Sequence, residues 1–190
     1  MLTLILIAIL VAIVINKGLR GIEYKQIHHF YLLLLGFALQ LFIFNERFAN
    51  SNYNKLTPII YIISLAILLL FMFLNIRYSG IKIATLGFLG NCIAIVANGG
   101  YMPQDLNKLE FVGNYQKADL LRKFGHFYNG VAMTADTKFN ILSDIVAVRK
   151  PEFLASVYSI GDVFITIGLI IFIFEILKRP KYDEDIDDEF

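Results

Sequence analysis

Asp162 is the residue whose chemistry most needs an explanation. It lies just inside an apolar block that runs from residue 157 to 177, and at helical spacing it shares a face with Ser159 and Thr166. A carboxylate costs about 2.5–3.5 kcal/mol at the centre of a membrane and less near its surface, so nearby donors must offset the charge. Two explanations stay open: a functional acid within the membrane, or a buried cap that anchors the preceding loop.

A second acid, Asp144, sits in a similar local pattern. "LSDIV" at 142–146 resembles "IGDVF" at 160–164, and each places an aspartate between a small residue and an apolar pair. If both carboxylates point into one site, they can bind a cation or share a proton. His126 and Asp136 would complete an acid–base set, although the chain has no nucleophile motif. Coincidence between short apolar strings is the simpler explanation.

The stretch "NGGYMP", residues 98–103, ends an apolar block abruptly. Gly99 and Gly100 permit positive backbone angles, and Asn98 tolerates the left-handed state, so a helix can stop sharply here. Tyr101 suits the headgroup layer of a membrane, and Pro103 prevents the helix from resuming. The exposed amide groups of such a turn can bind an anion or orient Asp162.

The block before this turn carries small residues at steps of three and four, which let helix backbones approach closely in lipid. The stripe consists of Ala84, Gly87, Gly90, Asn91, Ala94 and Asn98. Asn91 then either lines a cavity or bonds a neighbouring carbonyl within a tight helix contact. Both alternatives stay open.

We expect the glycine turn, its covering loop and Asp162 to converge at the outer mouth of a helix bundle. The candidate ligand-binding residues are Asn91, Asn98, Gly99, Gly100, Tyr101, His126, Asp144 and Asp162. The chain has no zinc, haem, phosphate-binding or dinucleotide-binding motif, so no cofactor and no metal site are predicted. Cys92 lies within an apolar block and has no cysteine partner.

The elements that position these residues follow from composition. Of the 190 residues 57% are apolar, with a mean hydropathy of +0.64, and they gather in five blocks. Only closed helices or barrels satisfy the backbone in lipid, and no alternating pattern favours a barrel. We therefore predict an all-α integral membrane protein with about five transmembrane helices. The blocks cover residues 1–15, 27–44, 57–74, 81–97 and 157–177.

This pattern divides the chain into four parts. Residues 1–97 form a four-helix transmembrane region, 98–156 an extracytoplasmic insert, 157–178 the fifth span and 179–190 an acidic tail. Within the insert, "TKFNILSDIVAV" predicts an amphipathic helix, and Pro151 suits the start of a helix that continues into the membrane.

Charge suggests how the chain is oriented. Lysine and arginine residues follow the first, third and fifth blocks, which favours an outside N-terminus and a cytoplasmic C-terminus in a bacterial plasma membrane. The acidic tail is typical of a solvated, disordered end. Basic residues are scattered among loops rather than gathered on one face, so nucleic acid is excluded as a partner.

Three strings together resemble a known family. "NGGYMP" after an apolar block, "ILSDIV" in the insert and "SIGDVFITIG" at the start of the last block are similar to the small bacterial membrane proteins of domain-of-unknown-function family 5317. The resemblance covers nearly the whole chain, although a glycine is expected where this chain has Ser143. It implies a bacterial plasma-membrane protein of several helices, and it implies no activity.

Two functions are therefore weighed. The first is a non-enzymatic ligand-binding or accessory subunit, with its site at the outer mouth of the bundle and with membrane lipids or another membrane protein subunit as partners. The alternative is a membrane-embedded enzyme acting on a lipid-linked or amphipathic substrate through Asp144, Asp162 and His126.

Overall fold

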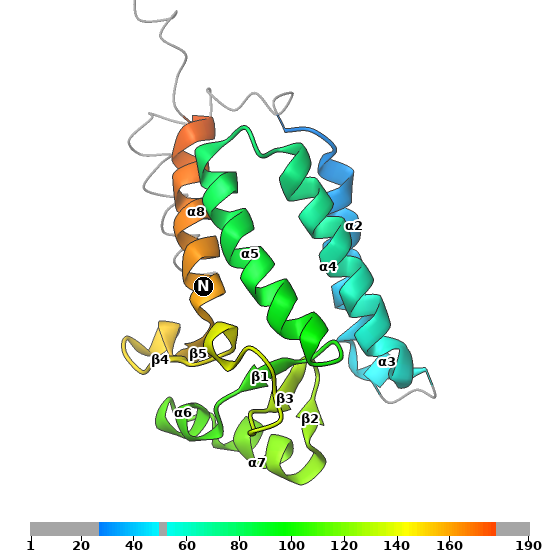
Figure 1. Ribbon diagram of the computed structural model, residues 1–190, viewed down its shortest axis with the longest axis vertical. Coiled ribbons are helices and arrows are strands. Elements are labelled where there is room, and N and C mark those ends of the chain that lie inside the picture. Colours follow the sequence, from blue (N-terminus) through cyan, green and yellow to red (C-terminus); the bar gives the residue numbers. More distant parts are fainter. Residues whose placement is uncertain (1–26, 50–52, 178–190) are drawn as a thin grey trace, which may run out of the picture.

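The computed structural model describes residues 27–49 and 53–177. It consists of a helical layer and a mixed cap that covers one end of the helices (Figure 1). The helical layer contains α2 (Phe30–Ile43), α4 (Thr57–Leu74), α5 (Ser79–Ala97) and α8 (Ile160–Leu177). The short helices α3 (Glu46–Ala49) and η2 (Asn54–Leu56) join α2 to α4.

The prediction of a five-span, all-α membrane protein was wrong. Among the described residues, two helices are long and apolar enough to cross a membrane, at Asn54–Leu74 and Ser79–Ala97, and β-strands form two small sheets. The apolar block at 27–44 contains only the 14-residue helix α2, about 21 Å long against a membrane core of about 30 Å. The block at 1–15 and the tail at 179–190 lie outside the described residues.

Two pairs of helices make up the helical layer: α2 packs along α4, and α5 packs along α8. Glycines hold α5 and α8 very close. A Cβ atom added at Gly87 would lie 2.3 Å from the carbonyl oxygen of Gly161, and one at Gly168 would lie 2.4 Å from the amide nitrogen of Ala84. This is the close backbone contact that small residues permit.

The far end of the α5–α8 pair is closed by a carboxylate. Glu175, near the end of α8, accepts hydrogen bonds from the amides of Ser79 at 3.1 Å and Gly80 at 3.0 Å. These are the first amide groups of α5, which have no partner within the helix. An acid at a helix N-terminus also complements the helix dipole.

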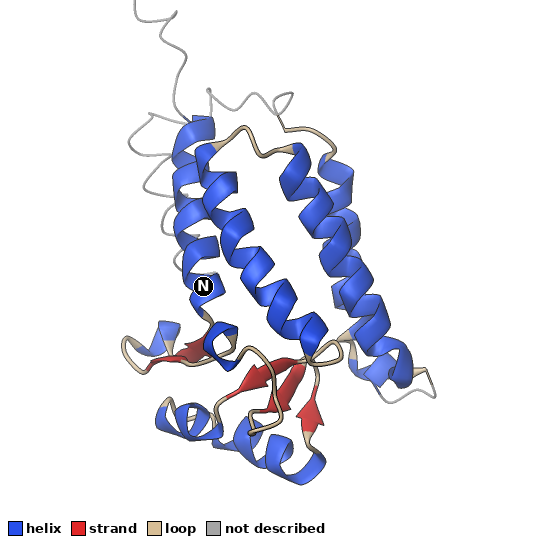
Figure 2. Cartoon of the chain, in the orientation of Figure 1, coloured by secondary structure: helices blue, strands red, loops and turns tan. Residues whose placement is uncertain are grey.

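The cap contains all the described strands, as Figure 2 shows. A three-stranded sheet has the order β1-β3-β2, in which β1 and β3 are parallel and β2 and β3 are antiparallel; a separate antiparallel hairpin pairs β4 with β5. The strands are β1 (Met102–Gln104), β2 (His126–Phe127), β3 (Gly130–Ala132), β4 (Val146–Val148) and β5 (Ser156–Tyr158).

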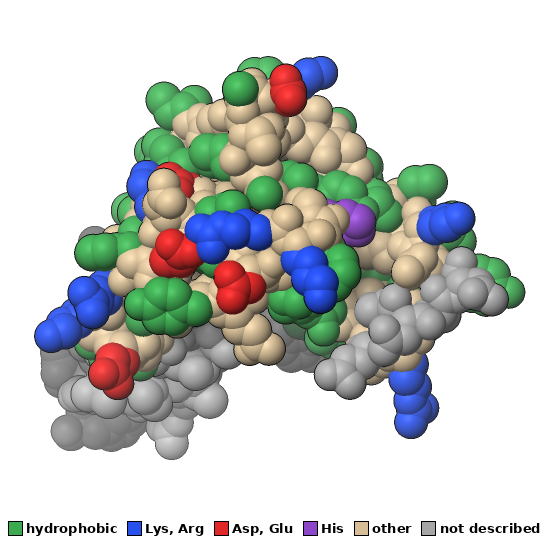
Figure 3. All heavy atoms as spheres, turned by 90° about the horizontal axis from the view of Figure 1, so that it is seen from below, with side chains coloured by type: hydrophobic (Ala, Val, Ile, Leu, Met, Phe, Trp, Pro, Cys, Tyr) green, Lys and Arg blue, Asp and Glu red, His purple; other side chains and the backbone are tan. Residues whose placement is uncertain are grey.

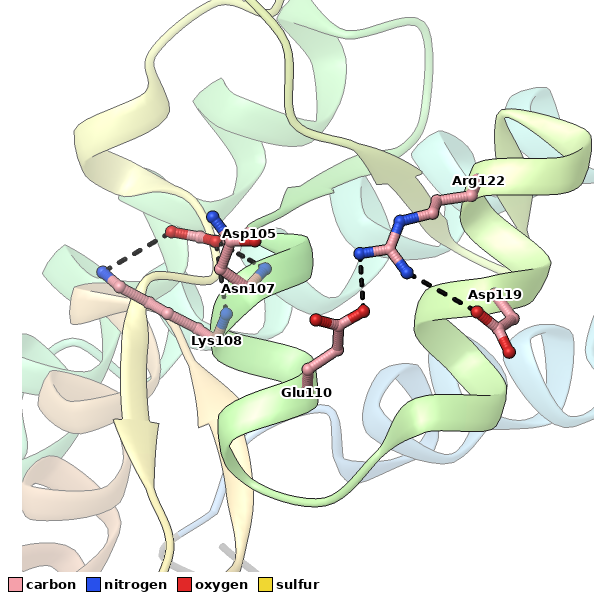
Figure 4. Close-up of polar contacts among 6 residues, drawn as sticks. All are labelled: Asp105, Asn107, Lys108, Glu110, Asp119 and Arg122. Carbon is pink, nitrogen blue, oxygen red and sulfur yellow. Dashed lines mark hydrogen bonds and ion pairs between the residues drawn. The ribbon is translucent and has the colours of Figure 1, made fainter.

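Two short helices, α6 (Leu106–Phe111) and α7 (Tyr115–Phe124), close the outer side of the cap. Their apolar faces share a small core with Val157 of β5, formed by Leu109, Ala118 and Leu121. Asp105 caps α6 by accepting hydrogen bonds from two backbone amides, while Arg122 of α7 contacts Glu110 of α6 at 2.5 Å (Figure 4).

The helix predicted for "TKFNILSDIVAV" does not form. This stretch contains the single turn η3 (Asn140–Leu142) and the strand β4, and Asp144 between them pairs with β1. The amide of Asp144 donates to Pro103 at 3.0 Å, and its carbonyl accepts from Asp105 at 3.3 Å. The adjacent β-branched residues Ile145 and Val146 favour this extended backbone.

The predicted helix from Pro151 into the membrane is also interrupted. It is replaced by η4 (Glu152–Leu154) and β5, and α8 begins only at Ile160. Pairing of β5 with β4 uses the backbone groups that a continuous helix would need.

Candidate functional site

Asp162 takes part in a helix cap. Its Oδ2 accepts a hydrogen bond from the amide of Ser159 at 3.1 Å, and the Ser159 hydroxyl accepts one from the amide of Asp162 at 2.8 Å. This reciprocal pair is a capping box, which satisfies two amides at the start of α8. Asn91 of α5 donates from Nδ2 to the remaining carboxylate oxygen at 3.0 Å. Both oxygens of Asp162 therefore have donors.

Asn91 links the two closely packed helices. Besides donating to Asp162, its Oδ1 accepts a hydrogen bond from the Ser159 hydroxyl at 2.7 Å, and Ser159 is fully buried. A side chain at Gly161 would collide with Asn91 Oδ1, at 2.2 Å from the added Cβ. The structure thus favours the tight helix contact over a cavity at Asn91. The hydrogen-bond partner of Asn91 is the carboxylate of Asp162 rather than the backbone carbonyl that the sequence led us to consider.

The glycine turn is a helix stop, as its residues predicted. The amide of Gly100 donates to the carbonyl of Ile95 at 2.9 Å, and that of Gly99 donates to Val96 at 3.2 Å, which is the Schellman pattern. Both glycines have positive φ, 69° and 93°. Gly100 also lies against Pro58 at the start of α4, where an added Cβ would be 2.6 Å from the proline side chain.

The turn does not supply the donors to Asp162. Asn98 instead holds the covering loop: its Nδ2 donates to the carbonyl of Lys138 at 2.8 Å, and its Oδ1 accepts from the amide of Lys138 at 2.9 Å. The hydrogen bonds to the Asp162 carboxylate come instead from the side chain of Asn91 and the backbone amide of Ser159, not from the amides of "NGGYMP".

Asp144 is buried in a different setting from Asp162. Its Oδ2 accepts a hydrogen bond of 2.5 Å from Gln104 Nε2, and the side-chain oxygen of Gln104 is buried without a partner. Burial raises the pKa of Asp144 from 3.8 to about 7; Gln104 and Lys117 oppose the rise, and Asp162 adds to it. A protonated Asp144 can donate to the free oxygen of Gln104, so the neutral pair satisfies both side chains.

His126 lies on the exposed side of the cap. It belongs to β2, and its ring lies 5.2 Å from the ring of Tyr101. The three residues of the enzymatic alternative therefore occupy three different settings. His126 is exposed and forms a ring pair with Tyr101, Asp144 is buried against Gln104, and Asp162 belongs to the helix cap of α8. Among the described residues, no group of three or more histidine, cysteine or acidic side chains can hold a metal ion.

A groove beside Asp162 was not foreseen from the sequence. It has a volume of about 270 Å³ and lies between the β4–β5 hairpin and α8. The hairpin contributes Val146, Val148, Leu154 and Tyr158. Strand alternation explains the strand residues of this wall, because Val146, Val148 and Tyr158 face the groove while Val157 faces the core of α6 and α7.

The α8 side of the groove is a helical stripe. It contains Asp162, Val163, Thr166, Ile167 and Ile170. Its polar atoms are already engaged, since Asp162 accepts from Asn91 and Ser159 and the Thr166 hydroxyl donates to the carbonyl of Asp162 at 2.8 Å. The groove is thus an apolar surface with fixed polar groups at one end, a composition typical of small-molecule sites.

Comparison with known proteins agrees with the resemblance noted in the sequence. A protein from Thermotoga maritima, described as uncharacterized, is 30% identical over 187 residues, which cover 96% of this chain and 93% of that protein. No solved structure matches the chain. The model of a family of unknown function, DUF5317, matches residues 24–174, and the chain belongs to this family.

Proposed function

We propose that the protein is a non-enzymatic accessory protein of the bacterial plasma membrane, and that its groove between the β4–β5 hairpin and α8 binds the acyl chain of a lipid. The groove is the observation that carries the proposal. Its lining is mainly apolar, with aliphatic side chains from β4, η4 and α8 and the aromatic ring of Tyr158 from β5.

Membrane placement is supported by the helices themselves. Asn54–Leu74 and Ser79–Ala97 are long and apolar enough to cross a bilayer. Large apolar side chains are exposed on the outer faces of the helical layer, including Leu41 at 76%, Ile59 at 59% and Leu86 at 65%. Exposed apolar faces of this extent are unfavourable in water and are expected in lipid.

An acyl chain is the favoured occupant because of where the groove opens. Val163 and Ile167, which line it, are 42% and 47% exposed on the outer face of α8. In a bilayer a lipid chain enters such a groove sideways without leaving an apolar environment. Both carboxylate oxygens of Asp162 and the hydroxyl of Thr166 already take part in hydrogen bonds within the chain, so the groove offers a ligand mainly apolar contacts.

The test is to fill the groove. The variant Val163→Phe adds a ring to the groove, and Ile63→Phe is its control, because Ile63 is 50% exposed on α4 and does not line the groove. Both proteins are purified in mild detergent, and bound lipid is counted by native mass spectrometry. Wild type and Ile63→Phe are expected to retain a stoichiometric lipid through detergent exchange, and Val163→Phe to lose it.

A photo-crosslinking residue at position 167 identifies the occupant directly. Crosslinks to lipid support the proposal. Crosslinks to residues 1–15 of the same chain, or to another protein, would show that polypeptide rather than lipid fills the groove and would overturn the proposal. Equal lipid retention in the two phenylalanine variants would overturn it as well.

A further inference from the structure

The hairpin that forms one wall of the groove also carries a projecting tip. The tip runs from Arg149, directly after β4, to Phe153 within η4, and every one of its residues is exposed. Phe153 is 58% exposed at its end. An aromatic ring of this exposure at a projecting turn does not contribute to the core of the cap.

The tip combines this ring with two cations. Arg149 and Lys150 are adjacent, and Glu152 is the single acid among them. The guanidinium group of Arg149 lies 5.6 Å from the ring centre of Phe111, which is itself 56% exposed. Aromatic rings next to basic side chains are typical of segments that lie in the headgroup layer of a membrane.

Its position in the fold matches this composition. Figure 1 shows the hairpin extending sideways from the start of α8, while α6 and α7 form the end of the cap farthest from the helices. If the helices cross a bilayer, a segment that projects sideways at their ends lies at the membrane surface. The far end of the cap, seen in Figure 3, mixes basic, acidic and apolar side chains, as expected for a surface in water.

We infer that the hairpin tip is an interfacial anchor, in which Phe153 enters the headgroup layer and Arg149 and Lys150 bind the phosphates of anionic phospholipids. The inference rests on the membrane placement proposed above and adds a second contact to the same lipid layer. Charge complementarity selects an anionic lipid surface, because the tip has two cations against one acid. The groove next to the tip then accepts an acyl chain from lipid held at this surface.

The chain contains no tryptophan, so a single substitution creates a unique fluorescent reporter. Three variants are reconstituted into vesicles: Phe153→Trp at the tip, Phe124→Trp at the end of α7, and Phe73→Trp on α4. Phe124 and Phe73 are matched in exposure, at 56% and 49%. Quenching is measured with phosphatidylcholine or phosphatidylglycerol brominated near the headgroup end of its acyl chains.

The tryptophan at position 153 is expected to be quenched, more strongly by phosphatidylglycerol, and the one at 124 to be unaffected. Each cation near an anionic surface changes association about fivefold. In the Phe153→Trp protein, Arg149→Gln and Lys150→Gln are each expected to lower the preference for phosphatidylglycerol by about that factor.

The three reporters separate the possible failures. If position 73 is quenched but position 153 is not, the anchor does not exist and the membrane placement stands. If position 153 is quenched equally by both lipids, binding of anionic headgroups is overturned. If position 73 is not quenched, the helices do not lie in lipid, and both this inference and the proposed function fail.

Discussion

Replacing Asp144 by asparagine is expected to stabilise the cap at pH 8. The Asp144 carboxyl is 8% exposed, and burial raises its pKa to about 7 from 3.8. At pH 8 the folded protein must therefore carry a charge that its surroundings disfavour. Asparagine has nearly the same shape, stays neutral, and its amide can donate to the unpartnered oxygen of Gln104 while accepting from Gln104 Nε2.

The sign and size follow from proton linkage. Below about pH 4 both the folded and the unfolded chain hold the proton, so the stability due to the neutral acid is fully present. As the pH rises from about 4 to 7 only the unfolded chain loses the proton, and the free energy of unfolding falls by about 1.4 kcal/mol per pH unit. Over this window of about three units the loss is about 4 kcal/mol, which Asp144→Asn avoids.

Hydrogen exchange measures this locally. The amide of Asp144 donates to the carbonyl of Pro103, and the amide of Asp105 donates to the carbonyl of Asp144. Both amide hydrogens therefore exchange with solvent only when this part of the cap opens. Protection factors are compared at pH 5 and pH 8. Between these two pH values the effective window is about two units, from pH 5 to the folded pKa of about 7. Wild-type protection is therefore expected to fall about a hundredfold, the equivalent of about 3 kcal/mol, and protection in Asp144→Asn to stay constant.

A matched control is Asp119→Asn, which changes a carboxylate whose side chain is 77% exposed. This variant is expected to retain the pH dependence of wild type. The reasoning is refuted if wild-type protection does not fall between pH 5 and pH 8, or if Asp144→Asn is less protected than wild type at pH 8.

Three further sets of substitutions test the packing and the caps, each by thermal unfolding in mild detergent. Gly87→Ala places a Cβ 2.3 Å from the Gly161 carbonyl oxygen and is expected to lower the free energy of unfolding by at least about 1–3 kcal/mol. Its control, Gly90→Ala, has its nearest neighbour at 3.8 Å and is expected to lower it little. Equal losses in the two variants would contradict the close contact of α5 and α8. Ser159→Ala and Asp162→Ala are each expected to lower the free energy of unfolding by about 1–2 kcal/mol. The double variant is expected to lose less than the sum, because each side chain bonds the backbone amide of the other residue, and strict additivity would argue against the capping box. Gly100→Ala is expected to destabilise more than Gly99→Ala, since both have positive φ but only Gly100 meets Pro58; the reverse order would show that backbone strain alone decides.

The helices were predictable because their signals are local. α4 spans Thr57–Leu74 with a proline in its first turn, and α5 ends one residue before Asn98, so apolar runs and stop residues place both of them. The cap was not predictable in this way. Most of its strands have three residues, too few for an alternating pattern. In addition, β1 pairs with β3, and the two strands are separated in the sequence by α6, α7 and β2.

The candidate site was predictable only in part, for the same reason. "SIGD" has the spacing of a capping box, so the partner of Asp162 was readable three residues upstream at Ser159. The small-residue stripe left two alternatives for Asn91, a cavity or a tight helix contact, and the structure shows the helix contact. The groove had no such signal, because one wall is a hairpin whose sequence favours helix as well as strand, and it exists only once β4 and β5 pair beside α8.

The settings of Asp144 and Asp162 favour the proposed binding role of this region over proton chemistry. A general acid or base needs a carboxyl group that faces its substrate and exchanges protons with it. Asp162 lines the groove, but both of its oxygens accept hydrogen bonds that hold α8 to α5. Asp144 has a pKa near neutrality, but it is buried against Gln104 and does not line the groove. The acid that reaches the groove is therefore fixed by its partners, and the acid that can change protonation is shielded from it, which leaves the apolar surface itself as the feature that a ligand can recognise.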